Sequence, residues 1–258
     1  MNRISVISIL ITLTALATFK VTAYQDPSAI DDGPQLIFVP NEAADFTVEQ
    51  QSRIETITKK VITQVQESFP TLSNNITFNY VMVDRDLTFV GGVSGRADRV
   101  NSIEIIFSST YPGGVDKATD DSLKVTLFHE LHHIIRGWLV LENKFGHGID
   151  IATINEGLAD VYSELEAGHP HATYTDSPDF DAWTKEILAL PVAAHGQYGE
   201  WMFQHPDGRQ AIGYRTGAWI VKKAMAASGN GIIELTQMSV NDIYALAGYK
   251  FRDNEGQL

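Results

Sequence analysis

The sequence contains no cysteine. Disulfide bonds and thiolate ligands are therefore excluded, and so is a lipid attached to an N-terminal cysteine. Any metal ion bound by this chain has to be held by histidine and carboxylate side chains.

Basic residues are also few. The chain has 19 lysines and arginines against 32 aspartates and glutamates, and its formal net charge is −13. A chain this acidic is repelled by the phosphates of nucleic acids and by anionic lipid headgroups. We therefore expect neither nucleic acid nor a membrane surface among its partners.

The N-terminal hydrophobic run is short. Residues 4–19 form an apolar stretch after Arg3, and Val21-Thr22-Ala23 fits the small-residue pattern of a cleavage site. A membrane-spanning helix needs roughly 20 apolar residues, although a retained membrane anchor is the alternative. We predict that residues 1–23 are a cleaved signal peptide and that residues 24–258 form a single domain, which is secreted or periplasmic.

The remaining sequence has the composition of an ordinary globular protein, with 44% hydrophobic and 20% charged residues. In its first part, Thr47 and Gln50 form a possible capping box for an amphipathic helix that ends before Pro70. Alternation of apolar and polar residues and clusters of glycine predict the other elements. These are strands over residues 35–39, 76–81 and 103–107, and turns at Gly91, Gly92 and Gly95.

Beyond residue 120 the pattern becomes helical. The predicted helices cover residues 120–136, 153–167, 177–189, 209–228 and 240–247, and the first begins with Asp120 or Asp121 as its cap. Gly168 is expected to close the second helix in a left-handed conformation. The irregular segment 168–208 is expected to cover or border a site. Together these elements predict an α/β fold, a small sheet followed by a mostly helical C-terminal half.

Three histidines and a glutamate fall within five consecutive positions of LFHELHHIIRGW, which begins at Leu127. On a helix, His129 and His133 lie about 40° apart on one face, so both imidazoles reach the same ion. Glu130 lies beside His129, where its carboxylate reaches a water on the metal without being a ligand. The structural alternative is a helix whose polar face happens to carry two histidines.

The next predicted helix supplies the group that this pair lacks. A catalytic zinc ion commonly takes three protein ligands and leaves a fourth position for water. In INEGLAD, Glu156 follows His133 by 23 residues and supplies the third ligand. Asp160, one turn later, is placed to accept the free ring N–H of a ligand histidine. The two helices therefore predict one Zn²⁺ ion bound by His129, His133 and Glu156.

These motifs resemble the gluzincin class of zinc metallopeptidases, in which H-E-x-x-H is followed on the next helix by N-E-x-x-[SA]-D. NEGLAD, beginning at Asn155, matches the second pattern. FHELHHIIRG, EGLAD and the later GYRTGAWIV are similar to a family of predicted zinc-dependent proteases, over roughly residues 122–249. The resemblance implies a zincin-like fold with the active-site helix beneath the sheet, His129, His133 and Glu156 as ligands, and Glu130 as general base.

The predicted function is an exported zinc-dependent peptidase that acts on a peptide or protein substrate. Glu130 would take the proton of the attacking water and pass it to the departing amine. The substrate would add as an extended strand to the sheet edge near residues 103–108. Two alternatives are a zinc hydrolase of a non-peptide amide and an inactive metal-binding scaffold of the same fold; the intact Glu130 argues against the scaffold.

The group that steadies the developing oxyanion is left open by the sequence. Tyr214, just ahead of an apolar helix, is the first candidate, and His195 in the irregular segment is the second. For each, the alternative is a structural tyrosine or a surface histidine. His132 points away from the shared face of its helix, so we expect it outside the ligand set. The remaining histidines are interpreted as loop residues: His147, His169, His171 and His205.

Overall fold

The computed structural model describes residues 33–40 and 45–251. The predicted signal peptide, residues 1–23, lies outside the described residues. Within the described part of the chain, no helix combines the length and the apolar character needed to cross a bilayer.

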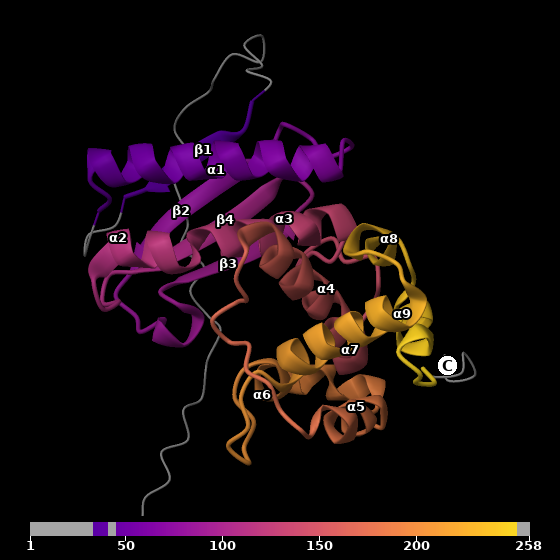
Figure 1. Ribbon diagram of the computed structural model, residues 1–258. Helices are drawn as coiled ribbons and strands as arrows, with labels where there is room; N and C mark the ends of the chain where they lie inside the picture. Colours follow the sequence, from indigo (N-terminus) through magenta and orange to yellow (C-terminus); the bar gives the residue numbers. More distant parts are fainter. Residues whose placement is uncertain (1–32, 41–44, 252–258) are drawn as a thin grey trace, which may run out of the picture. The chain divides into compact units, whose positions relative to one another are not determined.

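The first half of the described chain contains a mixed four-stranded sheet in the order β1-β2-β4-β3 (Figure 1). Its first three positions run parallel, and β3 pairs antiparallel with β4. The strands are β1 (Gln35–Val39), β2 (Thr77–Val83), β3 (Val93–Arg99) and β4 (Ser102–Ser108). Strand β3 is therefore an edge of the sheet, and β4 lies inside it.

Two predictions about this sheet are wrong. Gly95 forms no turn, because the chain already reverses at Gly91 and Gly92, whose φ angles are 75° and 85°, and Gly95 then pairs with Ile105 inside β3. The edge near residues 103–108 is not available to a substrate, because β2 and β3 occupy both sides of β4. The open edge on that side of the sheet belongs to β3.

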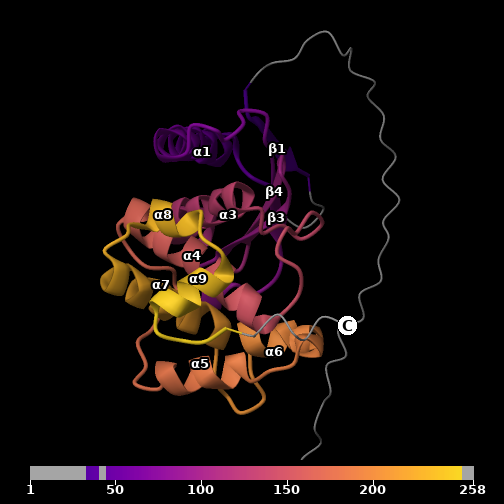
Figure 2. The ribbon, with the colours of Figure 1, turned by 90° about the vertical axis from the view of Figure 1, so that its right-hand side faces the viewer.

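Helix α1 (Val48–Ser68) and helix α3 (Lys124–Arg136) cover the same face of the sheet (Figure 2). Alternate residues of β2 and β4 are fully buried against these helices, and the residues between them are half-buried. The capping box of α1 is confirmed: the backbone N–H of Gln50 donates to Thr47 Oγ1, and the Thr47 N–H donates to Gln50 Oε1.

The helical run that leads into α3 begins earlier than predicted. Helix α2 (Gly114–Ala118) continues through the π-helical turn η2 (Thr119–Leu123) into α3 without a break, because the residues at both junctions keep helical backbone angles. Asp120 and Asp121 therefore cap nothing. Asp121 instead accepts a hydrogen bond from the Tyr111 hydroxyl and pairs with Lys117.

The rest of the chain is helical, and the α/β fold class with a helical C-terminal half is confirmed. Helix α4 (Ile149–Ala167) ends at Gly168, whose φ of 85° gives the predicted left-handed cap. The helices that follow are α5 (Phe180–Leu188), η3 (Val192–Gln197), α6 (Tyr198–Met202), α7 (Ile212–Ser228), α8 (Ile232–Thr236) and α9 (Val240–Leu246). The 3₁₀ turn η1 (Thr88–Val90) precedes β3.

Helices α4 and α7 approach each other closely through two glycines. A Cβ on Gly157 would lie 2.1 Å from the carbonyl carbon of Gly217, and a Cβ on Gly217 would lie 1.9 Å from the Thr153 carbonyl oxygen. Only a residue without a side chain fits either position. The contact brings Tyr214, about one turn before Gly217, toward Glu156, which precedes Gly157.

Candidate metal centre

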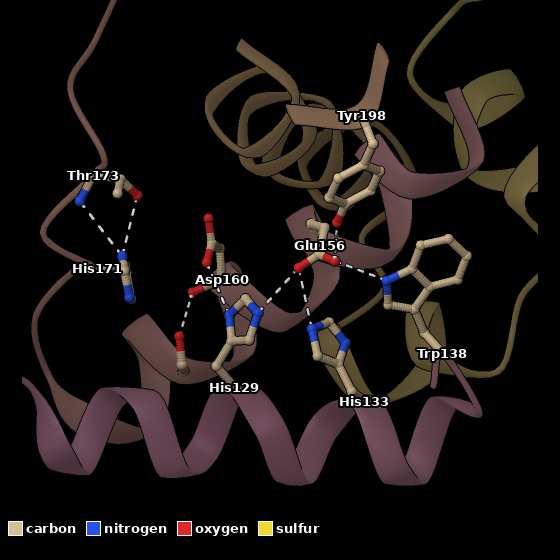
Figure 3. Close-up of polar contacts among 9 residues, drawn as sticks. His129, His133, Trp138, Glu156, Asp160, His171, Thr173 and Tyr198 are labelled. Atoms are coloured by element: carbon tan, nitrogen blue, oxygen red, sulfur yellow. Dashed lines mark hydrogen bonds and ion pairs between the residues drawn. The ribbon is translucent and has the colours of Figure 1, made fainter. Parts of the chain in front are cut away.

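Helices α3 and α4 bring two histidines and one glutamate to a single point. Nε2 of His129 and Nε2 of His133 each lie 3.1 Å from Oε2 of Glu156 (Figure 3). All three side chains are buried, and their donor atoms lie within 4.8 Å of one another. The two histidines come from successive turns of α3, as the spacing H-E-x-x-H predicts.

The cluster fits a zinc ion. Zinc binds histidine and carboxylate at about 2.0–2.1 Å, so two ligand atoms at a tetrahedral angle are about 3.3 Å apart. The two nitrogen–oxygen separations of 3.1 Å are close to this value. Neutral imidazole and carboxylate are also donors that zinc accepts in proteins, so the cluster has both the spacing and the chemistry of a zinc site.

The charge of the cluster also fits a cation. Burial raises the pKa of Glu156, but the positive charges of His133 and His129 outweigh burial and hold this pKa well below its usual value. Burial lowers the pKa of His129, but Asp160 and Glu156 outweigh burial and raise it well above its usual value. Buried carboxylates need a compensating positive charge, and a bound cation would supply it.

Glu156 is held by two further residues that the sequence did not point to. Its other oxygen, Oε1, accepts a hydrogen bond of 2.8 Å from Nε1 of Trp138 and one of 3.1 Å from the Tyr198 hydroxyl (Figure 3). These donors fix the carboxylate so that Oε2 faces the two histidines. Trp138 reaches it because Gly137, with φ 79°, ends α3 and turns the chain back.

Asp160 lies beside the first histidine. Its Oδ1 is 3.0 Å from Nδ1 of His129, and the aspartate is 4% exposed. It stands one turn beyond Glu156 on α4, so one helix face presents both carboxylates to His129. The geometry suits an acceptor that would fix the tautomer of this imidazole, and that role stays a prediction.

A family model described as predicted Zn-dependent protease (DUF2268) matches residues 54–245. The chain belongs to this family. The match runs from α1 to α9 and includes the whole metal cluster. No curated protein and no solved structure matches the chain.

Glu130 is buried beside the cluster. The pKa of its carboxyl group is raised, because the effect of burial outweighs the charges of His133 and His129 and the hydrogen bond from the Ala97 backbone, which lower it. Gly95 of β3 provides the space for it, since a Cβ there would lie 2.4 Å from Glu130 Cγ. The edge strand and the glutamate are therefore in direct contact.

The two candidates for the oxyanion-stabilising residue both line the cavity over the cluster. Tyr214 lines the cavity over the cluster, and its ring centre is 6.2 Å from that of His129. Its hydroxyl is hydrogen-bonded to Tyr198. His195 lines the same cavity, and its ring lies tilted beside that of His147, with ring centres 4.7 Å apart. Stabilisation of the oxyanion stays a prediction for both residues.

The remaining histidines lie outside the ligand cluster. His132 lies outside the ligand cluster in the core, where its Nε2 is 3.0 Å from Thr236 Oγ1. The Thr236 hydroxyl donates to the Ile232 carbonyl, so its oxygen accepts a hydrogen bond from the Nε2–H of His132. His171 lies in a loop, as interpreted, and it also lines the cleft, with its ring centre 6.1 Å from that of His129.

Arg136 joins the second motif to the end of α3. This buried side chain donates to Asn155 Oδ1 at 3.0 Å and to the carbonyl oxygens of Thr236 and Met238. It therefore ties α3, α4 and the connection between α8 and α9 together. Asn155, next to Glu156 in the motif, therefore has a structural role, and the spacing alone did not predict its contact with Arg136.

Proposed function

We propose that this protein is a zinc-dependent peptidase that binds one zinc ion through His129, His133 and Glu156. The proposal depends on one observation: these three side chains form a buried cluster, Glu130 lies beside it, and a cavity borders all four residues. Membership of a family described as predicted Zn-dependent protease supports the same conclusion.

When bound, zinc would polarise a substrate carbonyl and lower the pKa of a bound water to about 7. The chain's own residues would do the rest. Glu130 would accept the proton of the attacking water and deliver it to the departing amine, a role that general acid–base catalysis assigns to a carboxylate within reach of both.

The cavity supports Tyr214 as the donor to the carbonyl oxygen on which negative charge develops. Tyr198 already donates to Glu156, so its proton is engaged with a proposed ligand. Tyr214 borders the space on both sides of Glu130, whereas His195 borders it on one side. A phenol in that place is available to the substrate once it turns away from Tyr198.

The test pairs metal content with cleavage of an unfolded protein substrate, in the wild type and in Glu130→Gln. We expect about one zinc ion per chain in both proteins, and turnover roughly 10²–10⁴-fold lower in the variant because the general base is lost. A chelator should abolish cleavage by the wild type, and added zinc should restore it.

Other outcomes would contradict the proposal in distinguishable ways. One zinc ion without cleavage of any peptide would move the function to a non-peptide amide or to an inactive scaffold. Wild-type turnover in Glu130→Gln would remove the glutamate from the mechanism. No zinc in either protein would leave the two histidines as structural residues.

We also propose that the protein is exported and that residues 1–23 are removed. The support is the apolar run of residues 4–19 followed by Val21-Thr22-Ala23. Mass spectrometry of the protein purified from its native host should give an N-terminus after Ala23. A retained N-terminus would favour the membrane anchor instead.

A further inference from the structure

His171 lies in the loop between α4 and α5 and lines one part of the cleft, a cavity of about 340 Å³. Its ring centre is 6.1 Å from that of His129. The ring centre of Tyr214, which lines the same cavity, is 6.2 Å from that of His129. The proposed mechanism uses Tyr214, whereas it leaves His171, at nearly the same distance from the proposed ligand, without a role.

The loop around His171 is tied to helix α7. The Tyr174 N–H donates to the His171 carbonyl at 3.0 Å. Arg215 of α7 donates from Nε to the Thr175 carbonyl at 2.9 Å. On the same helix, Nζ of Lys222 lies 4.3 Å from the centre of the Tyr174 ring, an attractive contact between a cation and an aromatic face. These contacts fix where the loop places His171 at the wall of the cleft.

Thr173 determines which ring nitrogen of His171 carries the proton. Its backbone N–H donates to Nδ1 of His171 at 3.4 Å, and its Oγ1 lies 3.1 Å from the same atom (Figure 3). A backbone N–H can only donate, so Nδ1 is the acceptor and carries no proton. In the neutral imidazole the proton is then on Nε2. His171 therefore has a hydrogen-bond donor at the ring nitrogen that does not contact Thr173.

The Nε2–H of His171 is free to bind a ligand. Across residues 33–40 and 45–251 this atom has no hydrogen-bond partner, and it is not buried. The apolar residues that line the same cavity are Leu87, Phe89, Val90, Met202 and Phe203. In a largely apolar concave site, a small number of polar groups fix the orientation of the bound molecule. The Nε2–H of His171 has the position and the chemistry of such a group.

The position of this donor beside the metal cluster indicates what it binds. A peptide substrate has a backbone carbonyl at every residue, and neighbouring residues of an extended chain are about 3.3 Å apart. The scissile carbonyl would lie at the cluster. The His171 ring, with its centre 6.1 Å from that of His129, is then within reach of a carbonyl one or two residues away.

We infer that His171 binds the substrate: its Nε2–H donates to a backbone carbonyl one or two residues from the scissile bond, and Thr173 holds the imidazole in the tautomer that makes this contact. The inference rests on the proposed function. The carbonyl that His171 contacts does not react, so the contact is the same in the bound substrate and in the transition state. Its loss should therefore weaken binding and raise KM, while kcat stays close to the wild-type value.

The tautomer of His171 can be measured directly. Long-range correlations between the ring protons and the ring nitrogens in NMR spectra of the zinc-loaded protein distinguish the two neutral forms of each imidazole. The signals that disappear in His171→Gln belong to this residue. We expect the Nε2–H form, because the Thr173 N–H donates to Nδ1. The Nδ1–H form would overturn the inference, whether or not the other variants fold.

His171→Asn and His171→Gln form a matched pair for peptide cleavage. The side-chain nitrogen of glutamine reaches the position of Nε2, whereas that of asparagine reaches only the position of Nδ1. In His171→Asn we expect KM to rise about threefold to tenfold, the effect of one lost hydrogen bond, with kcat changed by less than about twofold. In His171→Gln, KM should stay within about twofold of the wild type. His169→Asn, an exposed position in the same loop outside the cleft lining, is the control.

Three kinetic results would contradict the inference, once circular dichroism establishes that the variants are folded. A wild-type KM in His171→Asn would mean that the donor contacts no substrate. Equal rises of KM in both variants would mean that the ring matters for packing and not for its Nε2–H. A loss of kcat of about 10²-fold or more in His171→Asn would place the residue at the oxyanion instead.

Binding without turnover separates the inference from the proposed function. The same peptides are titrated into zinc-loaded Glu130→Gln, with and without His171→Asn, and followed by calorimetry. Binding that is about threefold to tenfold weaker with His171→Asn would support the inference. If the wild type cleaved no peptide, that result would refute only the proposed peptidase. Equal binding by the two proteins would refute the inference alone, and no binding by either would refute both.

Discussion

His129, Glu130 and His133 come from five consecutive residues of α3, whereas the cleft around them is lined from many parts of the chain. Beyond α3 and α4, its lining residues come from residues 85–90, β3, residues 138–147, residues 171–173, η3, residues 198–203 and α7. The donor atoms of the cluster are placed by the repeat of one helix and by its contact with a second. The shape of the cleft beside these atoms depends on tertiary packing.

The metal cluster depends on local helical spacing, whereas the cleft depends on tertiary contacts. The two histidines of α3 need only the helical repeat to reach one point, and the Glu156 carboxylate meets both at the same distance of 3.1 Å. Tyr214 reaches the same place through the glycine contact between α4 and α7, and Tyr198 reaches it from the junction of η3 and α6. The cleft therefore depends on contacts that a local pattern does not encode.

The largest expected effect concerns the third ligand. In Glu156→Ala we expect zinc affinity to fall by more than about 100-fold, because losing a ligand exceeds the loss caused by removing a partner of a ligand. Competition with a chromophoric chelator measures it. Glu166→Ala, on the same helix and outside the cluster, is the control and should bind zinc like the wild type. Unchanged affinity in Glu156→Ala would move the third ligand to Asp160.

The features that the sequence predicted correctly depend on residues that are close together in the chain. The strand Gln35–Val39, the capping box of α1 and the cap at Gly168 all follow from residues close together in the chain, and the structure confirms them. Strand β3 was missed because SGRADR carries glycine and charge rather than an alternating apolar pattern. Its polar residues are tolerated because it is an edge strand beside a cleft.

The same reasoning explains what was missed at the site. Trp138 was visible in the sequence next to the metal motif, but only the reversal at Gly137 aims its indole at Glu156. Tyr198 and His171 carried no local signal, because they lie in the irregular segment 168–208. That segment was expected to border a site, and residues from it do line the cleft.

The second prediction tests whether the helix packing delivers a catalytic group. In Tyr214→Phe we expect kcat to fall by about 10²–10³-fold, the usual cost of losing one donor to a developing oxyanion, with zinc content unchanged. Tyr249→Phe, whose hydroxyl contacts Asp181 at the surface, is the control for loss of a phenol. An unchanged kcat in Tyr214→Phe would return the role to His195, for which His195→Gln is the matching variant.

The smallest expected effect concerns Trp138, the residue that links the cleft lining to the metal cluster. Trp138→Phe removes the N–H that donates to Glu156 Oε1 and keeps an aromatic ring against Phe145. We expect zinc affinity to fall by about 10- to 100-fold, the range for a group that orients a ligand. Trp219→Phe, on α7 beside Phe180, should leave it unchanged.

The result decides how separate the two regions are. A loss of affinity in Trp138→Phe would mean that a cleft residue sets the strength of metal binding, because the carboxylate needs two donors on Oε1 to keep Oε2 toward the histidines. Wild-type affinity would mean that Tyr198 alone orients Glu156. The metal centre would then depend on α3, α4 and one tyrosine.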